Sequence, residues 1–135
     1  MTIHAKQSEL VAEGIHIDFR IGGSLFSPKM LRAVSDVSFT LKAGEALAIV
    51  GESGSGKSTV ARMLVGLYQP SQGHFKLDGQ DVHATLPTPA GRTLRRRMQM
   101  IFQDPISSLD PRYTVRQLVS EPLEIWSRGS AEEQS

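Results

Sequence analysis

The sequence predicts an α/β fold in which an antiparallel pair of strands precedes a strand, a glycine-rich loop and a helix. Apolar and polar residues alternate over residues 15–21 and again over 37–41, which is the period of half-buried strands. Residues 46–50 form a short apolar run without alternation, typical of a strand that is buried on both faces in a parallel sheet. The loop of glycine and serine that follows leads into apolar residues at helical spacing.

The first two strands are expected to turn their apolar residues to one side and their polar residues to water. The inward side chains are Ile15, Ile17, Phe19, Ile21, Val37, Phe39 and Leu41. Glycine, serine and proline in residues 22–28 predict the loop that joins the strands. This pattern indicates an antiparallel β-subdomain with one solvent-exposed face.

The helix after the glycine-rich loop is expected over residues 57–67 and ends before Pro70. Its apolar face consists of Val60, Met63, Leu64 and Leu67. The sequence then predicts, in order, a strand at 75–77, a turn at Asp78-Gly79, a loop at 84–91, a short helix at 93–97 and a second buried strand at 98–102.

A final helix is expected after Thr114. Thr114 and Gln117 have the spacing of a capping box, in which each residue satisfies a backbone N–H of the other. The sequence places Val115, Leu118 and Val119 on the face that would point to the core.

Composition narrows the class of protein. The 135 residues suit one domain. The net charge of 15 − 14 = +1 gives no strong electrostatic attraction to nucleic acid. The absence of cysteine excludes a disulfide scaffold, a thiol nucleophile and cysteine-bound zinc. The apolar runs are too short for a signal peptide or a membrane span, so we expect a soluble, cytoplasmic protein.

The strongest chemical signal is the loop before the helix, which matches G-x-x-x-x-G-K-[ST]. Its residues are Gly51, Glu52, Ser53, Gly54, Ser55, Gly56, Lys57, Ser58 and Thr59. Backbone N–H groups in such a loop and at a helix N-terminus bind nucleotide phosphates, and glycines let the backbone approach them. Lys57 adds a cation for the β- and γ-phosphates, and the Ser58 hydroxyl is a ligand for Mg²⁺. The motif predicts nucleotide binding without choosing between ATP and GTP.

Other motifs separate the classes of P-loop protein. The GTPase motifs N-K-x-D and D-x-x-G are missing from the sequence. A small P-loop kinase would usually carry a lid with catalytic arginines. The one arginine cluster is more typical of a solvated face, and it consists of Arg92, Arg95, Arg96 and Arg97.

The segment after the second expected buried strand carries further motifs. I-F-Q-D-P at 101–105 places Gln103 directly after the apolar run, and S-L-D-P-R follows at 108–112. L-Y-Q-P-S-Q-G-H-F-K-L-D-G-Q-D-V stands at 67–82, and V-S-D-V-S-F stands at 34–39. Together with the loop, these motifs resemble the ATP-binding cassette (ABC) ATPases, in the branch of the oligopeptide and dipeptide importers. The resemblance covers residues from about 10 to 126.

The resemblance implies a P-loop NTPase core with an N-terminal antiparallel β-subdomain, and ATP and Mg²⁺ as cofactors. Residues 51–59 would hold the triphosphate, while Ser58 and Gln103 would complete the coordination of Mg²⁺. Phe19 would stack on adenine, with Phe26 in reserve, although Phe19 is equally well explained as a core residue of its strand. Residues 103–113 would lie near the coupling helix of a membrane subunit or form an ordinary surface loop.

The sequence departs from this family in three places. It contains no L-S-G-G-Q signature, no Walker B Asp-Glu after Gln103 and no switch histidine beyond it. We therefore expect one partial domain over 1–135, an incomplete ABC ATPase core that binds ATP-Mg without hydrolysing it alone. The implied partners are a second ATPase subunit and permease subunits, which would hold it at the inner membrane, with no nucleic acid. A stand-alone nucleotide-binding or regulatory module and a small P-loop kinase are the alternatives.

Overall fold

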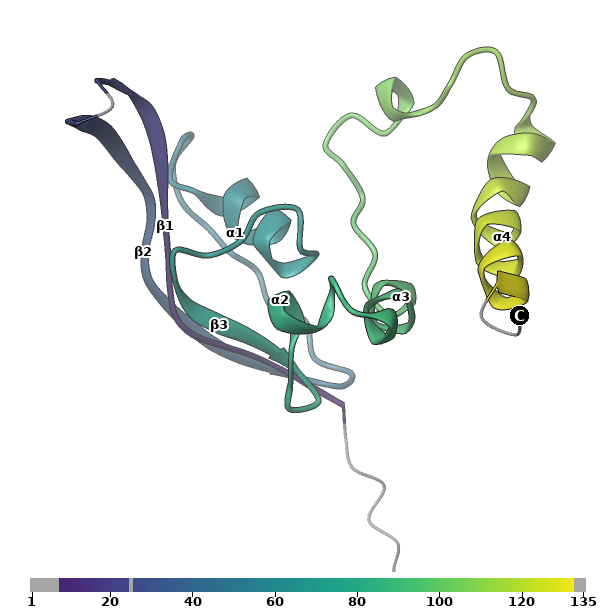
Figure 1. The fold of residues 1–135 in the computed structure, drawn as a ribbon, viewed down its shortest axis with the longest axis horizontal. Helices are drawn as coiled ribbons and strands as arrows, with labels where there is room; N and C mark the ends of the chain where they lie inside the picture. The colour runs from purple at the N-terminus through teal and green to yellow at the C-terminus, as the bar shows by residue number, and fades with distance from the viewer. Residues whose placement is uncertain (1–7, 25, 133–135) are drawn as a thin grey trace, which may run out of the picture. The chain divides into compact units, whose positions relative to one another are not determined.

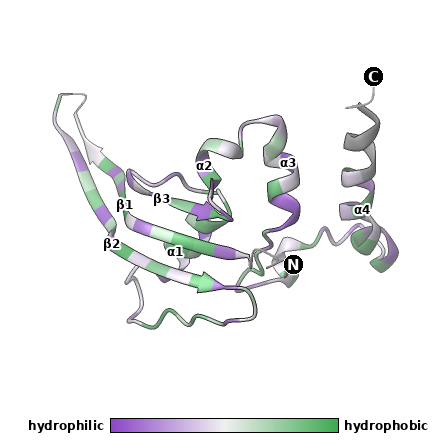
Figure 2. Ribbon diagram, turned by 90° about the horizontal axis from the view of Figure 1, so that it is seen from below, coloured by the Kyte–Doolittle hydropathy of each residue, from purple (hydrophilic) through white to green (hydrophobic). Residues whose placement is uncertain are grey.

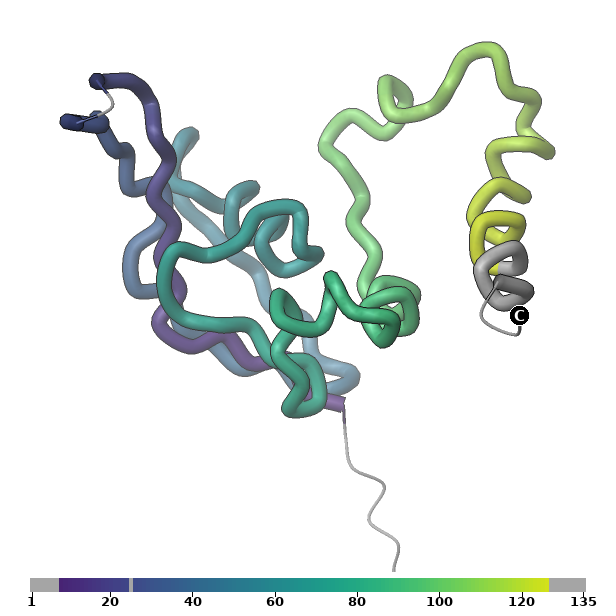
Figure 3. The backbone as a smooth tube through the Cα atoms, viewed as in Figure 1, coloured from purple at the N-terminus to yellow at the C-terminus, as the bar shows by residue number. Residues whose placement is uncertain are grey.

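The structure is a computed structural model that describes residues 8–24 and 26–132 (Figures 1 and 3). It consists of two compact units, one that ends at Met100 and one that begins at Ile101. The expectation of one partial domain over 1–135 therefore stays a prediction.

The first unit is built on an antiparallel sheet with the strand order β2-β1-β3-β4. Its strands are β1 (Glu9–Gly23), β2 (Pro28–Lys42), β3 (Gln72–Leu77) and β4 (Gln80–Asp81). The predicted antiparallel β-subdomain is confirmed, but the first two strands are longer than the alternation indicates. They pair out to Gly23 and Pro28, inside the stretch expected as a loop, because Phe19 and Arg20 find cross-strand partners in Leu31 and Met30.

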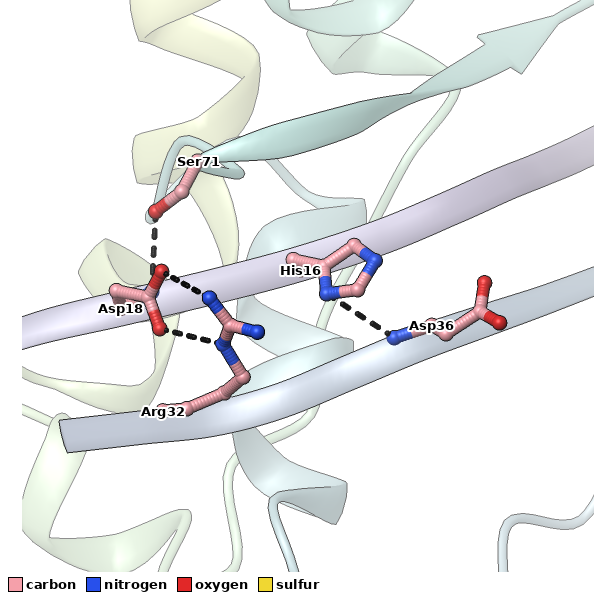
Figure 4. A network of polar contacts seen from close by, with 5 residues as sticks. All are labelled: His16, Asp18, Arg32, Asp36 and Ser71. Atoms are coloured by element: carbon pink, nitrogen blue, oxygen red, sulfur yellow. Dashed lines mark hydrogen bonds and ion pairs between the residues drawn. The ribbon is translucent and has the colours of Figure 1, made fainter.

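A polar network joins β1 and β2 at the irregular part of their ladder (Figure 4). The Arg32 guanidinium donates two hydrogen bonds to the Asp18 carboxylate, at 2.9 and 3.1 Å. The Asp18 backbone N–H donates to Ser71 Oγ at 3.0 Å, which ties the chain before β3 to β1. His16 Nδ1 accepts from the backbone N–H of Asp36, a residue with φ of 51° where the ladder shifts register. Side chains thus satisfy the backbone N–H groups of Asp18 and Asp36 in this part of the ladder.

The core lies between the sheet and three short helices, α1 (Lys57–Leu64), α2 (Val82–Thr85) and α3 (Pro89–Arg96). Hydrophobic and hydrophilic residues alternate along the strands in Figure 2, as the sequence pattern requires. The largest fully buried side chains are Phe75, Ile15, Met63 and Val82. The helix predicted over 57–67 is confirmed and ends earlier, at Leu64. Residues 84–91, expected as a loop, instead contribute to α2 and α3.

The turn at Asp78-Gly79 is confirmed as the link between β3 and β4. Both residues have positive φ, 54° and 83°, which suits the two-residue turns that join antiparallel strands. Gly73 has a different constraint, because a Cβ there would lie 2.1 Å from the carbonyl oxygen of Gly14. Glycine at that position lets β3 begin directly beside β1.

The two buried parallel strands expected at 46–50 and 98–102 do not form. Neither segment is a strand, and Leu47, Ile49 and Val50 are exposed. An apolar run becomes a parallel strand only where neighbouring strands pair with it on its edges. Among residues 8–24 and 26–132, no strand pairs with either segment.

The second unit contains a 3-10 helix (Ile106–Ser108) and the helix α4 (Val115–Glu132). The capping box is confirmed, because the Thr114 N–H donates to Gln117 Oε1 at 2.8 Å and the Gln117 N–H donates to Thr114 Oγ1 at 3.3 Å. The expectation that Val115 and Val119 face a core is wrong, since both are exposed and only Leu118 is half-buried. No helix in the described part of the chain is long and apolar enough to cross a bilayer.

Candidate functional site

The glycine-rich loop bends sharply before α1. Gly54 and Gly56 have φ of 81° and 92°, in the left-handed region that glycine enters without strain. Gly56 is the N-cap of α1, and a Cβ there would lie 2.5 Å from the carbonyl oxygen of Ala33 on β2. The helix therefore starts against β2 only because residue 56 has no side chain.

Lys57 holds the loop together from the first turn of α1. Its ammonium donates to the carbonyl oxygens of Gly51 at 2.8 Å and Glu52 at 2.5 Å, and lies 3.4 Å from Ser55 Oγ. The Ser55 N–H also donates to the Glu52 carbonyl at 3.2 Å. One cation thus joins the beginning of the loop to its end, and this closes the loop into a compact turn.

The N-terminus of α1 has no side-chain cap and no acidic residue in its first turn. The Val60 N–H donates to the Gly56 carbonyl at 2.9 Å, and the N–H groups of the residues before it have no carbonyl one turn back within the helix. Ser58 is exposed and Thr59 is half-buried. Free amide donors, a helix dipole and the Lys57 cation are a set that binds anions. The residues present therefore fit a polyphosphate group.

A shallow hollow with a largely apolar wall lies next to the loop. It is lined by loop residues including Gly51 and Lys57, by β2 and by the chain at 47–50. The apolar part of the wall includes Val34, Val37, Phe39, Leu47, Ile49 and Val60. An apolar wall does not attract phosphate, so the groups suited to an anion are those of the loop and of the start of α1.

Phe19, the candidate for stacking on adenine, is half-buried on β1. Its ring contacts Tyr68 edge to face, with centroids 5.3 Å apart and planes at 75°. It also packs against the core cluster. The contact explains Phe19 as a packing residue, and its role toward adenine stays a prediction. Phe26, the reserve candidate, is exposed in the turn between β1 and β2.

Gln103 belongs to the second unit, where it is exposed in an irregular segment. Ser58 belongs to the first unit, so their joint coordination of Mg²⁺ stays a prediction. The chain after Gln103 is ordered by local bonds. Ser107 N–H donates to the Asp104 carboxylate at 3.2 Å, and hydrogen bonds from Arg112 lower the pKa of Asp110. The proximity of residues 103–113 to a coupling helix is likewise untested.

Sequence reasoning missed a cluster around Asp78. Its carboxylate accepts hydrogen bonds from Ser8 Oγ and from the Glu9 N–H, both at 2.8 Å, and contacts the Arg97 guanidinium. The hydrogen bond from Arg97, followed by those from Glu9 and Ser8, lowers the pKa of Asp78 to about 2. Arg97 is exposed, as a solvated face requires, but its guanidinium also contacts the Asp78 carboxylate. The sequence signal at Asp78-Gly79 indicated only a turn, since the partners lie far apart along the chain.

The described histidines, which are His16, His74 and His83, belong to no metal site. His74 Nε2 lies 2.5 Å from the Glu13 carboxylate, which also binds Lys76 at 3.2 Å. Burial lowers the pKa of His83, whose Nε2 has no hydrogen-bond partner. Within the described ranges, no group of three or more histidine, cysteine, aspartate or glutamate side chains could hold a metal ion. His4 lies outside the described residues.

Comparisons with known proteins place the same residues in one family. The family model of the ABC transporter domain matches residues 34–134. A probable peptide ABC transporter ATP-binding protein of Sinorhizobium fredii, y4tS, is 50% identical over 109 residues, which are 81% of this chain and 31% of that protein.

Two further relatives have similar names. The oligopeptide transport ATP-binding protein AppF of Bacillus subtilis is 41% identical over 125 residues, covering 91% of this chain and 38% of AppF. The oligopeptide transport ATP-binding protein OppF of Haemophilus influenzae is 43% identical over 132 residues, covering 93% of this chain and 39% of OppF. The chain thus spans between about a third and two fifths of the length of these relatives.

Proposed function

The chain belongs to the ABC transporter family, and from this we propose that it carries the nucleotide-binding portion of an ATPase subunit that powers peptide import. The observation that carries the proposal is the left-handed Gly56 at the start of α1, followed by Lys57 with its ammonium on the loop. The relatives y4tS, AppF and OppF are described as peptide or oligopeptide transport ATP-binding proteins, which supports peptides as the transported class.

In this proposal the ligand is ATP with Mg²⁺. Residues 51–59 bind the triphosphate through their backbone N–H groups and through the Lys57 ammonium. Ser58 and Gln103 bind the metal. Phe19 contacts the adenine. Mg²⁺ supplies neutralisation of phosphate charge when it is bound. The uncapped first turn of α1 and the exposed Ser58 hydroxyl support the phosphate and metal roles.

The proposed partners are a second ATPase subunit and the permease subunits of an importer. Attachment to permeases would hold the protein at the cytoplasmic face of the inner membrane. Family membership supports this arrangement, since the ATP-binding subunits of ABC importers generally work with permeases. Hydrolysis by this chain alone is not part of the proposal, because its 135 residues contain neither a signature sequence nor a Walker B pair.

Thermal unfolding with and without ATP-Mg tests the proposal. At a ligand concentration 100 times Kd, binding stabilises the folded state by about 2.7 kcal/mol, which raises the unfolding temperature by several degrees. Lys57→Ala should abolish the rise, and chelation of Mg²⁺ should reduce it. Lys42→Ala is the matched control, because Lys42 is an exposed lysine at the far end of β2. A rise that survives in Lys57→Ala would contradict the proposal.

Phosphate release is the second measurement. The expected result is no steady release from ATP-Mg by the chain alone. Steady release that Lys57→Ala abolishes would show that the 135 residues suffice for turnover, and would overturn the binding-only part of the proposal. Transfer of phosphate to an acceptor would instead favour a small kinase.

A further inference from the structure

The turn that joins β1 and β2 carries apolar side chains that the described part of the first unit leaves exposed or half exposed. This region, residues 20–24 and 26–31, is called the hairpin tip. Phe26 is 96% exposed, and the side chains of Ile21, Met30 and Leu31 are about half exposed. In Figure 1 the paired ends of β1 and β2 extend away from the helices α1, α2 and α3. Large apolar side chains gathered on one projection mark a surface for a partner or a membrane.

The charge at the hairpin tip has one sign. Arg20 and Lys29 are its two charged residues, and the sequence has no aspartate or glutamate between Phe19 and Leu31. The carboxylate nearest along the chain is that of Asp18, and it forms a bidentate ion pair with Arg32. Within the described residues, neither Arg20 nor Lys29 has an ion pair with a carboxylate of the protein. The tip therefore presents two cations beside its apolar side chains.

The turn that presents Phe26 is closed by its own hydrogen bonds. The Ser27 N–H donates to the carbonyl and the hydroxyl oxygens of Ser24, at 3.3 and 3.1 Å. The Arg20 guanidinium donates to the same Ser24 carbonyl at 3.1 Å. A Cβ at Gly23 would lie 2.2 Å from the Ser27 carbonyl oxygen, so glycine is needed for the closure. These bonds hold Ser24 and Ser27 close together, and Phe26 beside them is exposed.

The distribution of the apolar side chains distinguishes a bilayer from a protein partner. Met30 and Leu31 are consecutive in β2 and so point to opposite faces of the hairpin. Leu31 pairs with Phe19, and Met30 pairs with Arg20. Apolar surface on both faces and at the end suits immersion in the interface of a bilayer, whereas a flat protein surface would cover only one face.

We propose that the hairpin tip binds directly to the surface of a membrane that contains anionic lipid. Phe26 enters the boundary of the acyl chains, and Arg20 and Lys29 lie against lipid phosphates. Apolar side chains in the interface combined with basic residues at headgroup level are the physical requirements for such binding. The proposal goes beyond nucleotide binding and beyond attachment through permeases, because it gives this chain its own contact with lipid.

Co-sedimentation of the 135-residue chain with vesicles tests the proposal in the absence of nucleotide, so that its outcome is separate from that of the ATP experiment. We expect binding to vesicles of phosphatidylcholine mixed with phosphatidylglycerol, and much weaker binding to phosphatidylcholine alone. Lys29→Gln should lower the partition coefficient roughly fivefold, and Phe26→Ser should lower it roughly tenfold. High salt should weaken the binding as well.

Two matched controls isolate the tip. Lys42→Gln removes a lysine from the other end of β2, and Leu67→Ser removes an exposed leucine after α1. Both should bind vesicles like the parent chain. Equal losses in the tip variants and the controls would overturn the proposal, because any exposed lysine or apolar residue would then serve.

Tryptophan fluorescence tests directly whether residue 26 contacts the lipid. In the double variant Phe26→Trp with Trp126→Phe, the emission should shift to shorter wavelength on adding phosphatidylglycerol vesicles and should be quenched by brominated lipid. An emission spectrum unchanged by vesicles would overturn the proposal. So would light scattering that shows a lipid-free dimer that Phe26→Ser dissociates, since the tip would then bind a second copy of the chain.

Discussion

Arg97, the C-cap residue of α3, contacts the carboxylate of Asp78, and that carboxylate also accepts hydrogen bonds from Ser8 and Glu9. The contact joins the start of β1, the turn after β3 and the end of α3. Three segments that are separate along the chain therefore meet at one half-exposed carboxylate.

This arrangement predicts a dependence of stability on acid. The pKa of Asp78 is lowered to about 2, below its ordinary value, so the unfolded chain binds a proton more readily than the folded chain. The contribution of Asp78 to stability is therefore complete at neutral pH and is lost as the pH falls from about 4 to about 2. Asp78→Asn should lower the free energy of unfolding at pH 7. It should also reduce the loss of stability between about pH 4 and pH 2, as measured by urea unfolding at each pH.

A double-mutant cycle separates the Asp78–Arg97 pair from the other bonds. Arg97→Gln should destabilise the protein, and its effect should shrink when Asp78 is already asparagine, because residues in contact are not additive. Fully additive effects would show that the ion pair contributes nothing of its own.

The burial of His83 predicts a second dependence of stability on pH, in a higher range than that of Asp78. Burial lowers its pKa, so the unfolded chain again binds the proton more readily. Stability should therefore decline as the pH falls below about 6.5, the ordinary value for histidine. NMR titration of the ring protons checks the direction: a His83 signal that titrates above the ordinary range would contradict it.

Two glycines of the loop provide a matched comparison. Both Gly54 and Gly56 have positive φ, so alanine at either should cost about 1–2 kcal/mol of backbone strain. A Cβ at Gly54 meets no atom within 4 Å, whereas one at Gly56 meets the Ala33 carbonyl and the Val34 side chain. Thermal unfolding should thus show Gly56→Ala as the more damaging change. Equal losses would mean that α1 can move away from β2.

Two phenylalanines provide a second comparison, between the core and the hairpin tip. Phe75 is 0% exposed, so Phe75→Ala should destabilise the protein by about 3–5 kcal/mol. Phe26→Ala removes an exposed ring and should change stability by about 0.5 kcal/mol or less. Chemical denaturation measures both. A large loss in Phe26→Ala would show that the tip packs against the protein.

Local patterns predicted the elements whose partners lie close in the sequence. Alternation identified β1 and β2, whose pairing needs only a turn between them, and the spacing of Thr114 and Gln117 identified the start of α4. The motif at 51–59 predicted a loop followed by a helix, because glycine conformation and helix starts are local properties.

The expectations that failed depend on distant partners. The runs at 46–50 and 98–102 have the composition of buried strands, but no described strand pairs with them. Val115 and Val119 lie at helical spacing, yet no described core covers them. In the same way, the sequence marks Asp78 only as a turn residue and does not reveal its contact with Arg97. Periodicity shows which residues are apolar, and it does not show whether a partner is present.

The position of Lys57 has a thermodynamic consequence. Its ammonium already has acceptors in Gly51 and Glu52, so a phosphate that recruits it replaces existing hydrogen bonds rather than satisfying an isolated charge. In the proposed nucleotide complex, phosphate binding at this loop is therefore an exchange, in which Lys57 contributes only the difference between a carbonyl and an anionic oxygen as its acceptor. The amide donors of the first turn of α1 have no acceptors within the helix, so in the proposed complex a phosphate adds hydrogen bonds there without breaking any inside the protein.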